Sequence, residues 1–329
     1  MRTRKTVFVA PFRRLLPLLA IASLALTGCT GSLARAIVEP DGFGSATLLP
    51  EDDLLELRSA MTGKLGADTV KAAGAGGAVI HAFVLEPGPY GLEWTSRQTR
   101  DGGFRFSFGW ESDSVTLRSR TEPRGTVVAL HGLGAEGVQL LTQALFFAEH
   151  GYRVVLPDLR AHGQSGGRFV TYGHRERTDV RELVATLGDR GLIARPLVLY
   201  GTSLGGSVAL QAAAGVDADR VVAVAAVADA REVIAEIGPE MVPGPLAPLL
   251  TEARIDEALD RAERLADFSF AEASPLSAAR SLSVPVLLVH GRDDELVPFE
   301  HATRLHEALP CSTLRPVDDR RHATLVMDR

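Results

Sequence analysis

A pentapeptide near the middle of the chain has the residue types and the spacing of a nucleophilic site. An apolar run at 196–200 is long enough for a buried strand, Gly201–Gly205 reads Gly-Thr-Ser-Leu-Gly, and residues 207–214 have helical character. At such a strand–turn–helix, Ser203 would project its hydroxyl from the end of a sheet, and the flanking glycines remove Cβ atoms that would collide with neighbouring backbone. The alternative is an ordinary glycine-rich turn without a reactive serine. A histidine and an acidic residue elsewhere in the chain, in the right order, would favour the nucleophilic site.

The elements that must position this serine begin near residue 79. Residues 79–85, 104–108 and 114–120 are expected to form strands that enter a sheet in antiparallel fashion. Further strands are expected at 126–130, 152–156, 220–228, 284–289 and 311–317, and helices at 135–151 and 178–187. The alternation of strands and helices predicts an α/β fold in which helices cover both faces of a mostly parallel central sheet.

Four motifs in this region together resemble the α/β-hydrolase superfamily, over roughly residues 79–329. Besides the pentapeptide, they are His-Gly-Leu-Gly at 131–134, Asp-Leu-Arg-Ala-His-Gly-Gln-Ser at 158–165 and Gly-Arg-Asp-Asp-Glu-Leu-Val-Pro at 291–298. Residues 166–173 resemble the lysophospholipase and serine aminopeptidase branch of that superfamily. The resemblance implies the α/β-hydrolase fold with a lid insertion at about 230–283, where we expect a loop at 238–245 and an amphipathic helix at 255–265.

The resemblance also implies a catalytic triad of Ser203, Asp294 and His322. His322 would accept the proton of the serine, and Asp294 would orient and stabilise the imidazole. The count from Gly291 and back from Val297-Pro298 favours Asp294 as the acid, with Asp293 and Asp229 as alternatives. Serine, aspartate and histidine then follow in the chain order typical of this superfamily.

Backbone groups would complete the site. The N–H of Leu204 opens the helix after the serine, and the resemblance implies the N–H of Leu133 as its complement in an oxyanion hole. His131, Asp158 and His162 are expected to support these loops rather than to react.

No cofactor or metal is expected. His301 and His306 stand five residues apart on what reads as a surface helix, and neither a His-Glu-x-x-His run nor a glycine-rich phosphate loop occurs. With 35 basic and 41 acidic residues and no basic stripe, nucleic acid is not an expected partner.

The combination predicts an enzyme. We expect a carboxylesterase or lipase-like serine hydrolase that cleaves small-molecule or lipid esters through an acyl-enzyme. A peptidase or thioesterase using the same triad, and a non-catalytic ligand-binding lipoprotein with a hydrolase fold, are the alternatives.

The N-terminus has the pattern of a bacterial export signal. Basic residues precede the short apolar stretch 15–26, and Leu26-Thr27-Gly28-Cys29 resembles the lipobox of lipoproteins. This implies removal of residues 1–28, lipidation of Cys29 and attachment to the extracytoplasmic face of a membrane in the cell envelope. A secreted protein or an uncut anchor are the alternatives. Residues 29–78 would form a tether and preamble, with a helix beginning near residue 50 and a flexible connector at 71–77, before the hydrolase domain at 79–329.

Only two cysteines occur, at positions 29 and 311. If Cys29 is acylated, no internal disulfide can form. Cys311 is expected to open the last strand as a small buried residue.

Overall fold

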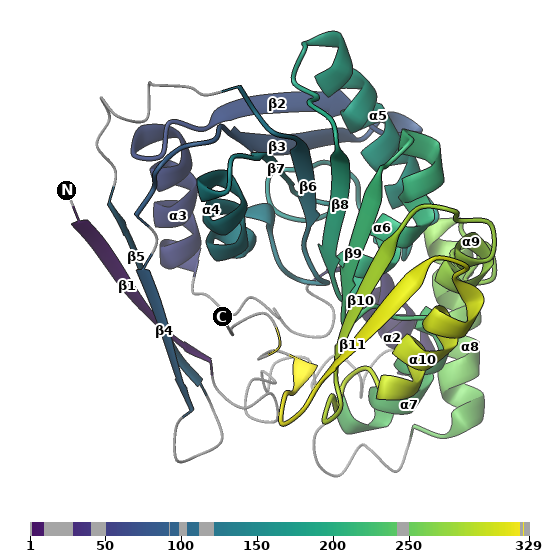
Figure 1. Cartoon of the computed structure of the whole chain (residues 1–329). Coiled ribbons are helices and arrows are strands. Elements are labelled where there is room, and N and C mark those ends of the chain that lie inside the picture. Colours follow the sequence, from purple (N-terminus) through teal and green to yellow (C-terminus); the bar gives the residue numbers. More distant parts are fainter. Residues whose placement is uncertain are drawn as a thin grey trace.

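The computed structural model describes residues 2–9, 29–40, 51–91, 93–98, 104–111, 122–241, 250–322 and 325. An eight-stranded sheet with the strand order β11-β10-β9-β8-β6-β7-β3-β2 forms its centre (Figure 1). The strands are β2 (Asp68–Ala73), β3 (Val79–Leu85), β6 (Thr126–Leu130), β7 (Arg153–Pro157), β8 (Leu197–Thr202), β9 (Arg220–Val224), β10 (Val286–Gly291) and β11 (Ser312–Val317). Only the pairs β2–β3 and β3–β7 are antiparallel, which confirms the predicted mostly parallel sheet.

Helices cover both faces of this sheet because the central strands are apolar on both sides. In β6, Val127 and Ala129 pack into one buried cluster and Val128 and Leu130 into the other. The first cluster contains residues of α3 (Glu51–Gly63), of the 3₁₀ helix η4 (Gly137–Leu140) and of α4 (Leu141–Glu149). The second contains residues of α5 (Glu176–Asp189), α6 (Leu204–Ala212), the 3₁₀ helix η5 (Ala213–Val216) and α10 (Phe299–Ala308).

Three helices lie between β9 and β10, in the predicted insertion: α7 (Ala230–Met241), α8 (Glu252–Ala266) and α9 (Pro275–Ala279). The amphipathic helix expected at 255–265 is confirmed as α8, which buries Ile255, Ala258, Leu259, Ala262 and Ala266. The loop expected at 238–245 is wrong for 238–241, because these residues end α7; residues 242–249 lie outside the described residues.

Helix α2 (Cys29–Val38) packs along α8 and buries Leu33, Ala34, Ile37 and Val38. The Thr30 hydroxyl accepts a hydrogen bond from Arg261 (2.8 Å) and donates one to Glu257 (3.3 Å), both on α8. The expectation of a tether is therefore wrong for residues 30–38. Apolar residues at helical spacing bind this segment to a distant part of the chain.

The flexible connector expected at 71–77 is also wrong. Residues 71–73 belong to β2, which pairs with β3, so the sheet begins before the domain boundary expected at 79. The 3₁₀ helix η2 (Ala75–Gly77) follows, and the N–H of Ala75 donates to the Asp179 carboxylate of α5 (2.7 Å). Asp179 also accepts two hydrogen bonds from Arg160, at 2.7 and 2.8 Å, and both side chains are buried.

Two expectations near strand ends need correction. The strand expected at 220–228 ends at Val224, because Ala225 has a positive φ of 49° that strand geometry does not allow. Cys311 is exposed in the turn before β11 rather than buried, since β11 is an edge strand. The strand expected at 114–120 lies outside the described residues.

A separate three-stranded antiparallel sheet has the order β1-β5-β4 and consists of β1 (Arg2–Val9), β4 (Glu93–Gln98) and β5 (Phe104–Glu111) (Figure 1). β1 consists of residues that removal of the predicted signal peptide would take away. The apolar stretch 15–26 lies outside the described residues. Among the helices that are described, none is long and apolar enough to cross a membrane.

We expect the substitution Asp179→Ala to lower the free energy of unfolding by about 3–5 kcal/mol, because it leaves the buried Arg160 guanidinium without its counter-charge. Urea unfolding followed by circular dichroism measures this. The control Asp189→Ala removes an exposed aspartate from the same helix and should change stability by less than about 0.5 kcal/mol. Equal effects of the two substitutions would contradict the structural role of Asp179.

Candidate active site

Ser203 lies on a strained turn between β8 and α6. Its φ of 53° and ψ of −118° are unfavourable for a residue with a side chain. A Cβ atom at Gly201 would overlap the carbonyl of Gly205, and one at Gly205 would overlap the carbonyl of Leu130 in β6. The N–H of Ser203 donates to the carbonyl of Val224 in β9 (2.8 Å), which holds the turn against the sheet. The glycines are therefore required by close backbone packing, as the pentapeptide predicted.

Asp294 and His322 form a hydrogen-bonded pair at the end of the sheet. His322 Nδ1 lies 2.8 Å from Asp294 Oδ2. The Asp294 side chain is completely buried, whereas that of His322 is 18% exposed. The other carboxylate oxygen, Oδ1, accepts the N–H groups of Leu296 (3.0 Å) and Val297 (2.8 Å). This places an oriented imidazole at the surface, above a fixed carboxylate.

The charge state of the pair follows from its contacts. Burial opposes ionisation of Asp294, but hydrogen bonds from His290 and His322 outweigh it and hold the pKa of Asp294 well below its usual range. Because the ionised carboxylate can only accept, Nδ1 of His322 must carry the proton. Nε2 of the neutral ring is then left as a base.

The two alternative acids have other positions. Asp293 is exposed, although it neighbours Asp294 in sequence. Asp229 accepts the N–H of Glu232 (3.1 Å) at the start of α7 and so caps that helix. Of the three candidates, the structure pairs Asp294 with His322.

The loop that carries His322 crosses the end of β10. A Cβ atom at Gly291 would overlap the carbonyl of Arg320, so this glycine permits the close passage. Ser203 follows β8, which is separated from β10 by β9. Among the hydrogen bonds of the described residues, none joins Ser203 Oγ to His322. The structure thus brings acid and base together and presents the serine at the end of β8, two strands away from β10.

Two N–H groups flank the serine. Leu204 is the first residue of α6, where the helix dipole is positive. Leu133 follows β6, and a Cβ atom at the adjacent Gly132 would lie 3.5 Å from the Cβ of Ser203. In the part of the chain that the structure describes, neither Leu133 nor Leu204 donates its N–H to another protein group. Both N–H groups are therefore available to a ligand, and their role as an oxyanion hole stays a prediction.

Buried histidines brace the turn that carries Leu133. His131 Nε2 accepts the N–H of Leu159 (2.8 Å), and its Nδ1 donates to the carbonyl of Gly132 (2.8 Å). Burial lowers the pKa of His131 to about 3, so the ring is neutral at physiological pH. His162 Nε2 accepts the N–H of Gly134 (3.1 Å).

Asp158 stabilises the same region through backbone groups. Its carboxylate accepts the N–H groups of Gly137 (2.9 Å) and Gln164 (2.8 Å). Together with the contacts of His131 and His162, this confirms the supporting roles expected for these three residues.

Sequence reasoning missed His290. This residue lies within β10, is 1% exposed, and places Nε2 3.4 Å from Asp294 Oδ2 and 2.8 Å from the carbonyl of Val297. Its position directly before the glycine of the Gly-x-x-Asp motif was the available signal. The expected surface position of His301 is also wrong, because this residue is buried and its Nδ1 accepts the N–H of Ala228 (3.3 Å).

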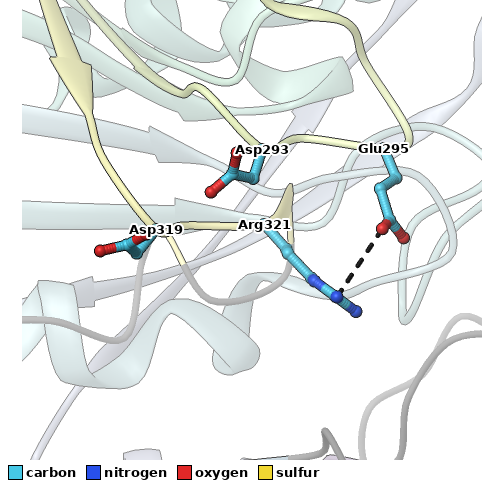
Figure 2. Close-up of a pocket in the computed structure, with 4 residues that line it drawn as sticks. All are labelled: Asp293, Glu295, Asp319 and Arg321. Atoms are coloured by element: carbon cyan, nitrogen blue, oxygen red, sulfur yellow. Dashed lines mark ion pairs between the residues drawn. The ribbon is translucent and has the colours of Figure 1, made fainter.

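An open hollow of about 590 Å³ is lined by residues of two loops, one that follows β10 and one that follows β11 (Figure 2). Its lining side chains flank Asp294 and His322 in sequence, and they are Asp293, Glu295, Asp319 and Arg321. Glu295 and Arg321 form an ion pair of 3.7 Å between the two loops. Among the described residues, no group of histidine, cysteine, aspartate and glutamate side chains could hold a metal ion.

We expect Gly205→Ala to destabilise the fold by about 1–3 kcal/mol and to remove most activity, because the new methyl group would push α6 away from the Leu130 carbonyl. Gly188→Ala is the matched control. No atom lies within 4 Å of a Cβ at that helical position, so its stability should stay equal or rise. Thermal unfolding and turnover of p-nitrophenyl acetate measure both effects. A fully active and stable Gly205→Ala protein would contradict the packing at the turn.

Several known proteins are similar to this chain in sequence or in fold. Residues 121–261 match the family described as serine aminopeptidase, S33. The protein YqkD of Bacillus subtilis is 31% identical over 208 residues, covering 61% of this chain and 65% of that relative's length. An esterase of Pyrococcus furiosus superposes with a TM-score of 0.55 at 20% identity, over 79% of this chain and 86% of the other. A puromycin-hydrolysing peptidase of Mycobacterium tuberculosis gives 0.51 at 20% identity, over 79% and 37%. The chain has the α/β-hydrolase fold.

Proposed function

We propose that the protein is a serine hydrolase that cleaves carboxylic ester bonds through an acyl-enzyme. The observation that carries this proposal is the hydrogen bond between Asp294 and His322, combined with a serine held on a strained turn at the end of β8. Such a pair has the chemistry needed to activate a hydroxyl that is otherwise a weak nucleophile.

The reaction would proceed in two balanced halves. His322 Nε2 takes the proton of Ser203 as Oγ attacks the ester carbonyl, and the oxyanion accepts hydrogen bonds from Leu133 and Leu204. The imidazolium, stabilised by Asp294, then gives its proton to the departing alcohol and leaves an acyl-serine. In the second half, water attacks the acyl-serine and loses a proton to His322. The imidazolium returns this proton to Ser203 Oγ as the carboxylic acid product leaves.

Attack requires Ser203 Oγ to approach His322 Nε2 to about 2.6–3.2 Å. His322 is partly exposed, and among the described residues its one hydrogen bond is that of Nδ1 to Asp294, so Nε2 is available to the hydroxyl when substrate binds. Hydrogen bonds of catalytic groups are often formed fully only in the complex with substrate.

Peptide bond cleavage is the second candidate, and the family match described as serine aminopeptidase favours it. The same triad would serve, because acyl transfer from an ester and from an amide share the tetrahedral intermediate. Both an esterase and a peptidase are among the proteins with this fold. The fold alone therefore does not distinguish ester hydrolysis from peptide hydrolysis.

A fluorophosphonate probe tests the nucleophile. We expect strong labelling of the wild type and none of Ser203→Ala, and we expect ester turnover in this variant to fall by about 10⁴–10⁶-fold while the protein stays folded. Ser281→Ala removes an exposed hydroxyl and should label like the wild type. Labelling that persists without Ser203, or a folded wild type that does not react, would rule out the proposed mechanism.

A substrate panel tests the reaction class. We expect p-nitrophenyl esters to be hydrolysed with a higher kcat/KM than the matching acyl p-nitroanilides and aminoacyl p-nitroanilides. Higher kcat/KM for aminoacyl anilides would instead support the aminopeptidase candidate.

We also propose that lipidated Cys29 anchors the protein to the extracytoplasmic face of a bacterial membrane. The Leu-Thr-Gly-Cys motif supports this, and Cys29 is the first residue of α2. Because α2 packs on α8 and Thr30 bonds to Glu257 and Arg261, no long linker would lie between the lipid and the folded domain. The surface of α8 around these two residues would then face the lipid headgroups.

Fractionation of the producing bacterium tests the anchor. We expect Cys29→Ser to leave the membrane fraction, and we expect Cys311→Ser, which changes an exposed cysteine, to remain there. Mass spectrometry of the mature N-terminus should show an acylated Cys29. A Cys29→Ser protein that stays with the membrane would argue against lipid anchoring.

A further inference from the structure

We propose that His290 is a positioning residue that fixes the loop carrying Asp294 and thereby the His322 imidazole, an inference that rests on the proposed serine hydrolase function. His290 lies in β10, next to last in the strand, and is 1% exposed. Its Nε2 faces two acceptors, both from the loop that leads to α10: the carbonyl of Val297 at 2.8 Å and Asp294 Oδ2 at 3.4 Å.

The acceptors determine the protonation of this ring. A backbone carbonyl can only accept, so Nε2 of His290 carries a proton and donates it to Val297. The same N–H lies against Asp294 Oδ2. Protonated at Nε2, the ring holds the loop without placing a second proton acceptor beside the carboxylate.

The contacts of His290 close a ring of hydrogen bonds around Asp294. The peptide of Val297 is held at both ends, since its N–H donates to Asp294 Oδ1 (2.8 Å) and its carbonyl accepts from His290. Oδ2 receives His322 Nδ1 at 2.8 Å, with His290 on its other side. Loss of His290 would leave a buried carbonyl without its partner and free one side of the carboxylate.

Two further observations support this role. Burial disfavours the charge of Asp294, and the bonds from His290 and His322 together keep its pKa low, so His290 helps to maintain the anion that orients His322. The ring itself is held by Phe299, whose edge-on contact has a centroid distance of 5.9 Å and an interplanar angle of 87°.

Two amide substitutions distinguish the loss of the hydrogen bond made by Nε2 from the loss of side-chain volume. In His290→Gln the side-chain NH₂ can reach the place of Nε2, whereas in His290→Asn it is one methylene too short. We expect kcat for p-nitrophenyl acetate to fall by about 10–100-fold in His290→Asn with KM within twofold of the wild type, and we expect His290→Gln to recover kcat to within about fivefold. Measurements are made below the melting temperature of each variant.

Proton NMR reports on the hydrogen bond between His322 and Asp294, which would not change if His290 served only to stabilise the fold. The downfield Nδ1–H resonance of His322 should shift or broaden in His290→Asn and return in His290→Gln. Wild-type kcat and an unchanged His322 resonance in both variants would overturn the proposal.

Nitrogen NMR of the wild type, labelled with ¹⁵N-histidine, tests the proposal without any variant. We expect the His290 ring to be protonated at Nε2, and a ring protonated only at Nδ1 would overturn the proposal even if neither variant folds. This test also distinguishes the positioning role of His290 from the proposed hydrolase function. Absence of fluorophosphonate labelling would rule out the hydrolase function, whereas the protonation of His290 Nε2 shows whether its hydrogen bond to Val297 exists.

Discussion

The close approach of three backbone segments at Ser203 is the constraint on which the site depends. The carbonyl of Leu130 in β6 and that of Gly205 in α6 occupy the space where Cβ atoms at Gly205 and Gly201 would lie. This contact forces Ser203 into its unfavourable backbone conformation, and burial of α6 offsets the strain. It also brings the start of α6 and the turn after β6 together, so one packing contact positions both the candidate nucleophile and the two candidate oxyanion donors.

The supporting groups around this turn are largely histidines in buried positions. His131 and His162 accept backbone N–H groups and brace the turn that carries Leu133, and His290 donates to the loop that carries Asp294. A neutral imidazole can donate at one nitrogen and accept at the other, so it joins two loops without adding a charge to the interior. The one carboxylate of the proposed triad that must be buried, Asp294, is surrounded by N–H groups. In the proposed mechanism, His322, Ser203 and the N–H groups of Leu133 and Leu204 are then the groups that meet the substrate.

The parts of the structure that the sequence predicted are those determined by local patterns. Apolar runs identified β3, β6 and β10, the spacing of Gly and Ser identified the turn, and the resemblance to the α/β-hydrolase superfamily implied the pairing of Asp294 with His322. The failures involve residues whose structure is determined by distant partners. Residues 71–73 are a strand because β3 offers a pairing edge, and α2 is ordered because α8 buries its apolar side. Cys311 is exposed because β11 is an edge strand, and the contact of His290 with Val297 depends on the course of a loop that no motif specifies.

The most direct measurement of the central claim is a crystal structure of the protein after reaction with a phosphonate that mimics the tetrahedral intermediate. We expect phosphorus bonded to Ser203 Oγ, the phosphonyl oxygen within hydrogen-bond distance of the N–H groups of Leu133 and Leu204, and His322 Nε2 turned toward the position of the leaving group while Nδ1 stays on Asp294. An adduct on another residue, or one in which His322 remains beyond reach of Ser203 Oγ, would contradict the account.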